Sequence, residues 1–357
     1  MSERPTQRRL VVLLWLTVAA AVAYLCRNAI GVAESTIRED LGLTKAQSGW
    51  FMGAFFWTYA IFQVPTGLLA EQRGARSTLS LFAIGWSLAA LALSAAPGLA
   101  LLIFAQLIMG IAQAGIFPAS CSSIGHWLPM SRRSLACGIL AAGMQVGAIV
   151  ASLLTGPLLE SIGWRPAFAI FALPGFAWAA GFRQTYRNHP DEDERVNDAE
   201  RARIHAGSPA DLNEAQQTQA DSAESAFSLL DLARCPVIWW LCGQQICRSA
   251  GYMFFASWFP TFLQKTRGIS VSESGYLQGL VLAGTLAGSL VGGVLTDRIW
   301  TATRNLRFSR SGVGGTFLGL CAVLILMAWF VKSVILAVLL LSAGAFFAAM
   351  AGPCALA

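Results

Sequence analysis

The chain alternates between long apolar segments and short polar ones. About 20 consecutive apolar residues are needed to cross a hydrocarbon core of about 30 Å as a helix. The ten-residue alternation that is typical of a membrane β-barrel does not occur. The pattern predicts an all-α polytopic membrane protein with ten spans, at residues 10–30, 50–70, 78–96, 99–119, 134–154, 166–182, 236–263, 274–295, 312–331 and 333–357.

Composition and charge narrow the class of protein further. Apolar residues make up 55% of the 357 residues and charged residues only 12%, whereas a soluble domain carries about 25% charged residues. A soluble enzyme and a nucleic-acid-binding protein are therefore excluded. The net charge of +6 does not indicate a polyanion partner, because the basic residues lie in the loops between spans.

The distribution of these basic residues predicts the orientation. With the N-terminus in the cytoplasm, 17 basic residues lie in cytoplasmic segments and six in outer loops, as the positive-inside rule requires. We therefore expect a monomeric, multi-pass protein of the cell (inner or plasma) membrane, with its N-terminus in the cytoplasm and the lipid bilayer as its surroundings.

A polar segment divides the chain into two parts. It has eleven acidic and six basic residues between positions 183 and 234, which is typical of a solvated connection. We predict an N-terminal six-helix bundle at 1–182, a cytosolic linker with a short surface helix at 183–235, and a C-terminal bundle at 236–357.

The two parts also repeat each other. Three sequence matches occur in the same order at offsets of 221, 226 and 226, namely 26–29 with 247–250, 47–50 with 273–276 and 67–71 with 293–297. Duplicated bundles around a site at the membrane midplane are typical of transporters. Since the first repeat has six spans and the second four, we expect the chain to be truncated in helix ten.

Arg27 and Arg248 are the two basic residues near the middle of a span. An arginine at that depth costs about 2.5 to 3.5 kcal/mol on insertion scales, and all 19 acidic residues lie in loops or at span ends. The matched positions in the two repeats favour an anion site in which the guanidinium groups bind a substrate carboxylate. The alternative is that each arginine extends to the interface or binds helix carbonyls.

Other polar side chains accompany the two arginines in the apolar spans. They predict either a polar cavity or hydrogen bonds between helices, and they are Tyr24, Asn28, Tyr59, Gln106, Gln113, Gln145, Gln244 and Tyr252. Glycines at four-residue spacing instead predict close helix packing: Gly143 with Gly147, and Gly284 with Gly288 and Gly292. No phosphate-binding loop, catalytic group or metal-ligand cluster occurs, so we expect a protein that is not an enzyme and has no cofactor.

Several stretches resemble the major facilitator superfamily over essentially the whole chain. Residues 67–76 resemble its loop between helices two and three, and residues 296–298 resemble the copy between helices eight and nine. Residues 59–67, 115–119 and 258–261 resemble the anion:cation symporter branch, which includes bacterial hexuronate and galactonate transporters, sialin and vesicular glutamate transporters.

The resemblance implies a fold of two pseudo-repeated bundles, of which six plus four spans are present, and it implies residue roles. Arg27 would bind the substrate carboxylate, with Tyr24, Tyr59 and Gln145 at positions like those that contact a sugar acid, and Arg248 resembles the helix-seven arginine of the vesicular carriers. The conformational-switch loops would comprise Gly67, Glu71, Arg73, Gly74, Arg76, Asp297 and Arg298.

Departures from the family pattern concern the coupling ion. Bacterial members usually have an acidic residue before the helix-one arginine, and an Arg and a Glu in helix four, where this chain has Cys26, Gln106 and Gln113. The remaining groups that can titrate are Glu34, Glu160 and His126. We therefore predict secondary transport of an organic anion, such as a hexuronate or aldonate, by alternating access, with H⁺ or Na⁺ as a coupling ion if coupling is retained.

Two alternatives to an anion transporter remain open. The first is a drug or metabolite exporter of the same fold, although Ala151 and Ser152 stand where such exporters often have Gly-Pro in helix five. The second is a sensor or relic that no longer transports.

Overall fold

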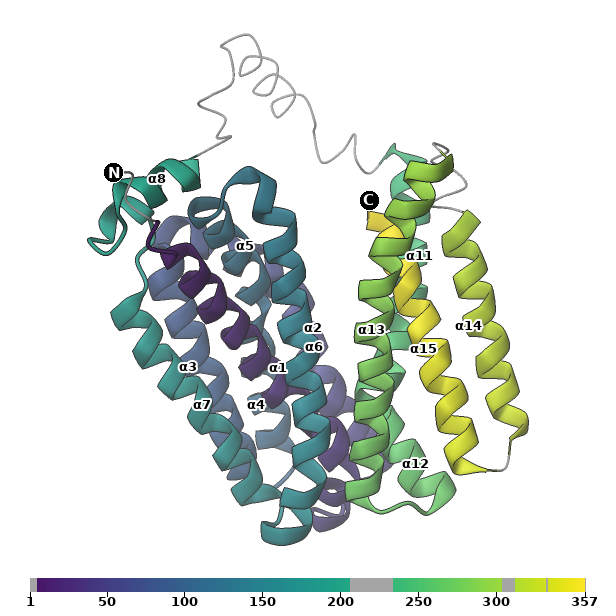
Figure 1. The fold of residues 1–357 in the computed structure, drawn as a ribbon. Coiled ribbons are helices and arrows are strands. Elements are labelled where there is room, and N and C mark those ends of the chain that lie inside the picture. Colours follow the sequence, from purple (N-terminus) through teal and green to yellow (C-terminus); the bar gives the residue numbers. More distant parts are fainter. Residues whose placement is uncertain (1–4, 206–233, 304–311, 332, 357) are drawn as a thin grey trace. The chain divides into compact units, whose positions relative to one another are not determined.

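The computed structural model of the chain describes residues 5–205, 234–303, 312–331 and 333–356, and these residues are almost entirely helical (Figure 1). Each of the ten predicted spans lies on helix, which confirms the all-α fold class. The helices are α1 (Arg8–Asp40), α2 (Lys45–Arg73), α3 (Ala75–Ser94), α4 (Leu99–Ala114), α5 (Ile116–Trp127), α6 (Met130–Ile162), α7 (Trp164–Thr185), the 3-10 turn η1 (Pro190–Glu192), α8 (Asp198–His205), α11 (Pro236–Met253), the π-turn η3 (Phe254–Trp258), α12 (Phe259–Arg267), α13 (Val271–Thr303), α14 (Val313–Phe330) and α15 (Val334–Leu356).

Seven segments among the described residues are long and apolar enough, by length and composition, to cross a membrane. They lie on α1, α3, α4 with α5, α6, α13, α14 and α15. The chain is therefore a multi-pass membrane protein.

Two predicted spans are broken rather than continuous, and a proline follows each break within three residues. Pro118 has no N–H to bond the carbonyl of Ala114, and the helix is interrupted at Gly115 between α4 and α5. Pro260 likewise cannot bond the carbonyl of Ala256, and the π-turn η3 separates α11 from α12 at that point. A missing donor of this kind commonly produces a kink or a π-bulge.

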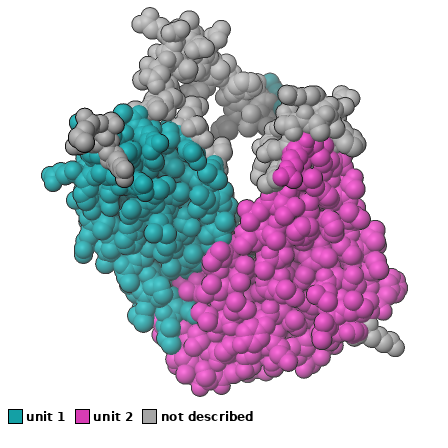
Figure 2. Space-filling model, viewed as in Figure 1, with its two compact units in different colours: residues 1–23, 50–143, 170–251 teal, residues 24–49, 144–169, 252–357 magenta. Residues whose placement is uncertain are grey.

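The described helices form two compact units (Figure 2). Unit 1 comprises residues 1–23, 50–143 and 170–251, and unit 2 comprises residues 24–49, 144–169 and 252–357. Five helices contribute to both units: α1, α2, α6, α7 and α11. The division of the sequence at residues 182 and 236 remains a prediction about bundles.

Aromatic side chains form the core of unit 1. Trp178, Phe182 and Tyr186 recur every four residues, and the ring centroids of each successive pair are 4.4 Å apart. The indole N–H of Trp178 donates to the carbonyl oxygen of Trp15 at 2.9 Å, and the hydroxyl of Tyr186 donates to Ser123 Oγ at 2.9 Å. The polar atoms of Trp178 and Tyr186 are thus hydrogen-bonded, as buried Trp and Tyr usually are.

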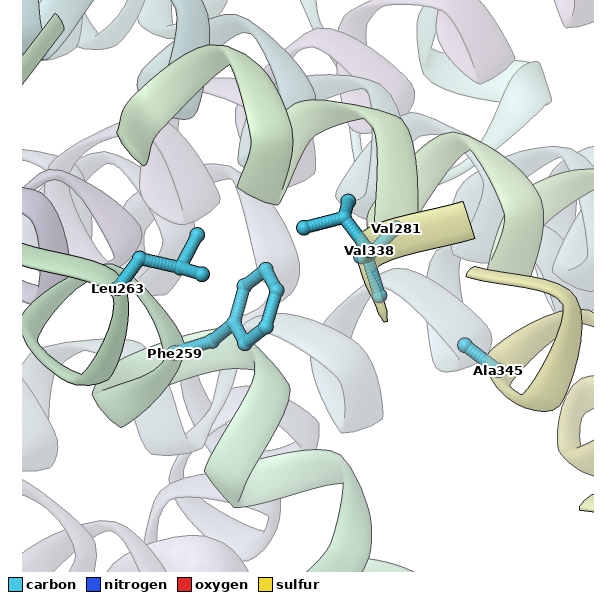
Figure 3. Close-up of a cluster of buried hydrophobic side chains, with 5 residues drawn as sticks. All are labelled: Phe259, Leu263, Val281, Val338 and Ala345. Atoms are coloured by element: carbon cyan, nitrogen blue, oxygen red, sulfur yellow. The ribbon is translucent and has the colours of Figure 1, made fainter. Parts of the chain in front are cut away.

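Unit 2 has an aliphatic and aromatic core that joins three helices (Figure 3). Phe259 and Leu263 of α12 pack against Val281 of α13 and against Val338 and Ala345 of α15. All five side chains are buried. The core therefore fixes α12 onto α13 and α15.

Small residues let α13 and α15 approach closely within unit 2. A Cβ atom at Gly284, Gly288 or Gly292 would lie 3.0, 2.2 or 2.6 Å from backbone atoms of Ser342, Phe346 or Met350, respectively. The contact confirms the packing role predicted for these glycines. In unit 1, a Cβ at Gly143 would meet Thr17 Cγ2 at 2.5 Å.

Candidate functional site

Tyr24, Arg27 and Asn28 lie on one turn of α1, in unit 2. The guanidinium carbon of Arg27 lies 5.1 Å from the ring centroid of Tyr24, a distance at which the cation is attracted to the ring face. Both side chains are half-buried. Asn28 is 5% exposed, and its amide donates to the carbonyl oxygen of Tyr24 at 2.9 Å. The structure thus brings together the α1 part of the predicted site and shows that one Asn28 bond goes to the helix backbone.

Three predicted polar residues lie in unit 1. Gln113 of α4 is buried, and its Nε2 donates to the carbonyl oxygen of Ala23 in α1 at 3.0 Å. Gln106 is also buried, and the half-buried Tyr59 stacks on Phe55 with ring centroids 5.4 Å apart. Gln113 therefore forms a hydrogen bond between helices, the alternative that the sequence left open, and it does so one turn before Arg27.

The structure describes only some of the side chains of the remaining predicted binding residues. Gln145 is half-buried on α6 in unit 2, and Gln244 is half-buried on α11 in unit 1. The backbones of Arg248 and Tyr252 are helical, but their side chains lie outside the described residues. Their roles remain predictions.

The structure adds partners for Glu34, which the sequence identified only as a titratable group at a span end. Glu34 is 1% exposed and accepts hydrogen bonds from Arg38 Nε at 2.9 Å and Thr261 Oγ1 at 2.7 Å. It also accepts one from Ser48 Oγ. The partners lie on α1, α2 and α12, all within unit 2. The spacing of four between Glu34 and Arg38 predicts their ion pair, but only the fold reveals Ser48 and Thr261.

The predicted switch loop joins α2 to α3 in unit 1. Gly74 has a φ of 77°, and a Cβ there would meet Asn188 Nδ2 at 2.4 Å, so both conformation and space favour glycine. Asn188 Oδ1 in turn accepts the backbone N–H of Arg76 at 2.9 Å, and Arg76 Nε donates to the carbonyl oxygen of Arg183 at 2.8 Å. Sequence analysis missed Asn188, which lies in the segment predicted as linker.

The other switch residues differ in their surroundings. Glu71, Arg73 and Arg298 are exposed, whereas a Cβ at Gly67 would contact Pro118 at 3.3 Å. The side chain of Asp297 lies outside the described residues. A switching role for this set remains a prediction.

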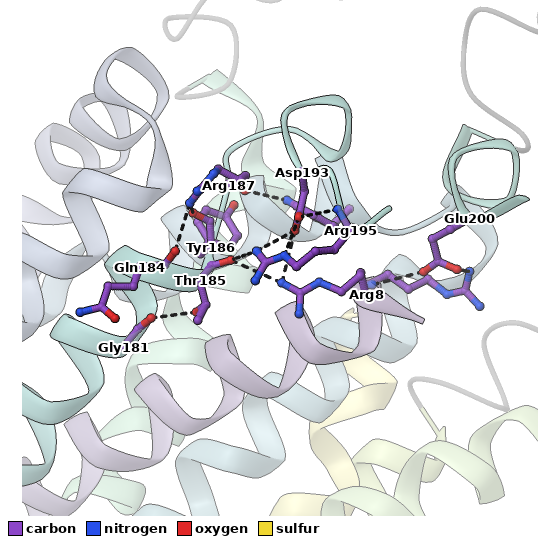
Figure 4. Close-up of polar contacts among 11 residues, drawn as sticks. Arg8, Gly181, Gln184, Thr185, Tyr186, Arg187, Asp193, Arg195 and Glu200 are labelled. Carbon is purple, nitrogen blue, oxygen red and sulfur yellow. Dashed lines mark hydrogen bonds and ion pairs between the residues drawn. The ribbon is translucent and has the colours of Figure 1, made fainter. Parts of the chain in front are cut away.

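The first part of the predicted linker packs on the N-terminal end of α1 in unit 1 (Figure 4). Arg8 pairs with Asp193 at 3.2 Å, and Arg9 pairs with Glu200 of α8 at 3.1 Å. Asp193 and Glu200 are 3% and 0% exposed. The polar segment therefore contains buried acidic partners for arginines nearly 200 residues away in the chain, while residues 206–233 of the predicted linker lie outside the described residues.

Asp193 gives this cluster a defined dependence on pH. Burial would raise its pKa, but hydrogen bonds from Arg195 and the charges of Arg195 and Arg8 outweigh burial, so its pKa lies below the ordinary value of 3.8. A carboxylate with a lowered pKa stabilises the fold at pH values above its ordinary pKa. This stabilisation is lost as the pH falls through the pKa of the folded state.

We therefore expect Asp193→Asn to lower the melting temperature in detergent by a constant amount above about pH 5. The difference from the unsubstituted chain should shrink toward zero below about pH 4. Asp198→Asn, at a position with a 97% exposed side chain, is the control and should show no such difference. A pH-independent difference for Asp193→Asn would contradict the assignment.

The long apolar helices, the breaks within two of the predicted spans and the half-buried cation on α1 fit a membrane transporter. Residues 16–357 match the Major Facilitator Superfamily. The chain belongs to this superfamily, as its switch-loop and span motifs predicted.

Relatives and solved structures agree with this assignment. The chain is 28% identical, over 91% of its length and 74% of the relative, to a protein named as a probable sulfoacetate transporter of Cupriavidus necator. It is 27% identical to the D-galactonate transporter of Escherichia coli (87% of this chain, 72% of the relative). It is 26% identical to the hexuronate transporter of Bacillus subtilis (96% and 78%). A bacterial homolog of the human lysosomal transporter Spinster, in an inward-facing and occupied conformation, has the same fold, with a TM-score of 0.75 at 23% identity (99% of this chain, 74% of that one).

Proposed function

We propose that this protein transports small organic anions, such as hexuronates, aldonates or related carboxylates, across the cell membrane by alternating access. The observation that carries the proposal is the half-buried guanidinium of Arg27, held against Tyr24 on a membrane-spanning helix. The names of the relatives, which include galactonate, hexuronate and sulfoacetate transporters, support this class of substrate.

Arg27 has the chemistry that such a substrate requires. Arginine stays charged at every physiological pH and offers a planar set of donors that fits a carboxylate with two parallel hydrogen bonds. The Tyr24 ring restricts the rotation of the guanidinium, which reduces the entropy lost when an anion binds. Tyr59, Gln145, Gln244, Arg248 and Tyr252 complete the proposed binding set, and Asn28, Gln106 and Gln113 line its polar surroundings.

The proposal extends to orientation and coupling. The N-terminus lies in the cytoplasm, the protein acts as a monomer, and the loops with Glu71, Arg73, Arg76, Asp297 and Arg298 take part in switching between states. Coupling to H⁺ or Na⁺ supplies the driving force if a titratable or ion-binding group responds to the change of state.

Uptake of labelled galactonate and glucuronate into proteoliposomes tests the proposal. We expect Arg27→Ala to reduce uptake at least about 30-fold, because truncating one partner of a buried charge pair costs about 2 to 5 kcal/mol. Arg27→Lys should retain part of the activity, since lysine keeps the charge but not the planar donor set.

Arg132→Ala is the matched control, because it removes the same charge from an exposed position at the beginning of α6. It should leave uptake unchanged. Uptake by the Arg27→Ala protein at the unsubstituted rate would exclude Arg27 as the anion-binding residue, and failure of the native chain to take up any organic carboxylate would exclude the proposed substrate class.

A further inference from the structure

Two cysteines of unit 1, one on α5 and one on α6, lie in contact. The sulfur atoms of Cys121 and Cys137 are 3.8 Å apart. Cys121 lies six residues before the end of α5, and Cys137 lies seven residues after the beginning of α6, so both are about 10 Å along their helices from the turn between them. A thiol is a weak donor and a weak acceptor. The contact by itself therefore adds little to the stability of the fold.

The turn between α5 and α6 sets the register of the two thiols. Arg133 of α6 donates from Nη2 to the carbonyl oxygen of Gly125 at 2.7 Å and from Nε to that of Leu128 at 3.2 Å. The carbonyl of Gly125 has no helical donor, because the residue four positions later is Pro129 and proline has no N–H. Arg133 supplies the missing donor, so the end of α5 is held to the first turn of α6 by defined bonds.

The backbone beside the pair is not closely packed. No atom lies within 4 Å of a Cβ built at Gly125, four residues after Cys121, or at Gly138, the residue after Cys137. Both cysteines are half-buried. A small molecule can therefore reach the sulfur atoms, and their separation can change slightly without a backbone clash at these glycines.

The surroundings of the pair restrict the kind of ligand that it can bind. Both cysteines lie in segments that are apolar enough to cross a membrane. A charged thiolate is costly there, and thiols have to be deprotonated to bind a metal cation. The described residues contain no group of three or more His, Cys, Asp or Glu that could hold a metal ion, whereas a structural zinc site needs four ligands. A ligand that suits this pair is uncharged and is held by two sulfurs alone.

Trivalent arsenic has the chemistry that these conditions require. Phenylarsine oxide is uncharged and condenses with two thiols: one As–S bond forms to each sulfur, the bond between arsenic and oxygen breaks, and the oxygen leaves with both thiol protons as water. Arsenic and sulfur keep their oxidation states, so no oxidant or reductant takes part. The product is neutral, so apolar surroundings do not oppose its formation.

The separation of the sulfurs also fits a bridging atom. An atom that bonds two sulfurs at about 2.3 Å with tetrahedral geometry, as zinc does, holds them about 3.8 Å apart. The observed separation is 3.8 Å. Arsenic bonds sulfur at a similar length and at a narrower angle, so the two thiols have to approach each other only slightly.

We propose that Cys121 and Cys137 form a dithiol site that binds uncharged compounds of trivalent arsenic through both sulfur atoms. The site uses none of the proposed anion-binding residues and does not depend on the proposed transport function. Its two bonds tether α5 to α6. A second bond formed within the same molecule raises the affinity over that of a single bond by about 10²- to 10⁴-fold, which distinguishes the pair from a single thiol.

Phenylarsine oxide is the probe for this site. The full chain in detergent is treated with the probe and washed with excess glutathione, whose single thiol removes arsenic that is held by one cysteine. Native mass spectrometry then counts the adducts that remain. We expect one adduct per chain, which dithiothreitol removes because it offers two thiols. The probe should also raise the melting temperature of the chain, because a ligand that binds only the folded state stabilises it.

Two conservative variants test the role of each sulfur. Cys121→Ser and Cys137→Ser each leave one thiol, so each should lower the apparent affinity for phenylarsine oxide by at least about 100-fold. Neither should retain an adduct after the glutathione wash or gain melting temperature with the probe. Cys242→Ser, at an exposed cysteine of α11, is the matched control and should bind the probe as the unsubstituted chain does.

Peptide mapping of the adduct in the unsubstituted chain locates the arsenic even if a serine variant does not fold. Arsenic bridging Cys121 and Cys137 would support the proposal. Three results would overturn it: an unsubstituted chain that retains no adduct after the wash, an adduct that survives in either serine variant or maps to other cysteines, and a disulfide between Cys121 and Cys137 in protein purified without a reductant.

Discussion

Replacing Gly288 with leucine is expected to abolish folded protein. A single Cβ at this position would lie 2.2 Å from the carbonyl oxygen of Phe346, and the three heavy atoms beyond it would enter the same contact. The obstacle is backbone rather than a flexible side chain, so α13 and α15 must separate. Close approach of small residues is a main source of helix association in membranes, and that source is lost along the whole contact.

The expected cost exceeds the usual range for overpacking, which is about 1 to 3 kcal/mol. A Cβ at neighbouring Gly292 would lie 2.6 Å from the backbone of Met350, so a shift at Gly288 also opens the next turn. Gly288→Ala should give a milder effect, with a melting temperature lowered but a monodisperse fraction retained.

The measurement is the monodisperse fraction on size-exclusion chromatography, followed by thermal melting. Gly319→Leu on α14 is the matched control, because it makes the same substitution in the same unit at a site with no atom within 4 Å of the new Cβ. Leucine also favours helix over glycine by about 0.8 kcal/mol. Equal yields of the two variants would contradict the packing role of Gly288.

The sequence was sufficient to predict the helices and the close-packed glycines. Apolar length alone predicted helix at all ten segments, because in lipid the backbone has to satisfy its own hydrogen bonds, and seven of the segments found in the structure are long and apolar enough to cross a membrane. The small residues at positions 284, 288 and 292 share one face of a helix by periodicity. Periodicity does not identify the partner helix, so the contact with Phe346 required the structure.

The sequence was least informative where contacts join distant segments. The breaks at Gly115 and at residues 254–258 lie beside Pro118 and Pro260, but Pro65, Pro157 and Pro174 lie in continuous helices, so neither hydropathy nor the positions of prolines predict where a helix breaks. The partners Ser48 and Thr261 of Glu34 lie 14 and 227 residues away in the chain. For the candidate site, sequence correctly identified a polar face on α1, but the bonds of Gln113 and Asn28 to backbone carbonyls follow only from packing.

The charged segment after α7 is the clearest example of a contact between distant segments that the sequence does not predict. A run of acidic residues in a polar segment predicts a solvated linker, because charged side chains are seldom fully buried without a partner. Here the partners are Arg8 and Arg9 at the beginning of α1. Two short-range patterns, one basic and one acidic, combine into a buried cluster that neither predicts alone.

Glu200→Ala is therefore expected to detach α8 from unit 1. The carboxylate of Glu200 accepts from both the backbone N–H and the guanidinium of Arg9, at 3.3 and 3.1 Å. Its removal leaves the guanidinium of Arg9, with a side chain only 15% exposed, without its anion. Breaking a buried pair from one side costs about 3 to 5 kcal/mol. With only eight residues, α8 is too short to be stable as an isolated helix.

Limited digestion with trypsin measures the detachment at Arg201 and Arg203, which lie on α8. When opening is fast relative to cleavage, the rate follows the population of the open state, so a cost of about 3 kcal/mol predicts cleavage roughly 150-fold faster. Glu194→Ala, at an exposed acidic residue of the same segment, should leave the rate unchanged.

Arg9→Ala and the double variant complete a cycle that separates pairing from packing. Each single variant leaves one buried charge without its partner, whereas the double variant removes both charges. The double variant should therefore be destabilised by at least about 1 kcal/mol less than the sum of the two single effects. Additive effects would show that Glu200 holds α8 through its packing alone. A shortfall would show that the ion pair fixes the acidic segment after α7 to α1, the helix that also carries Arg27.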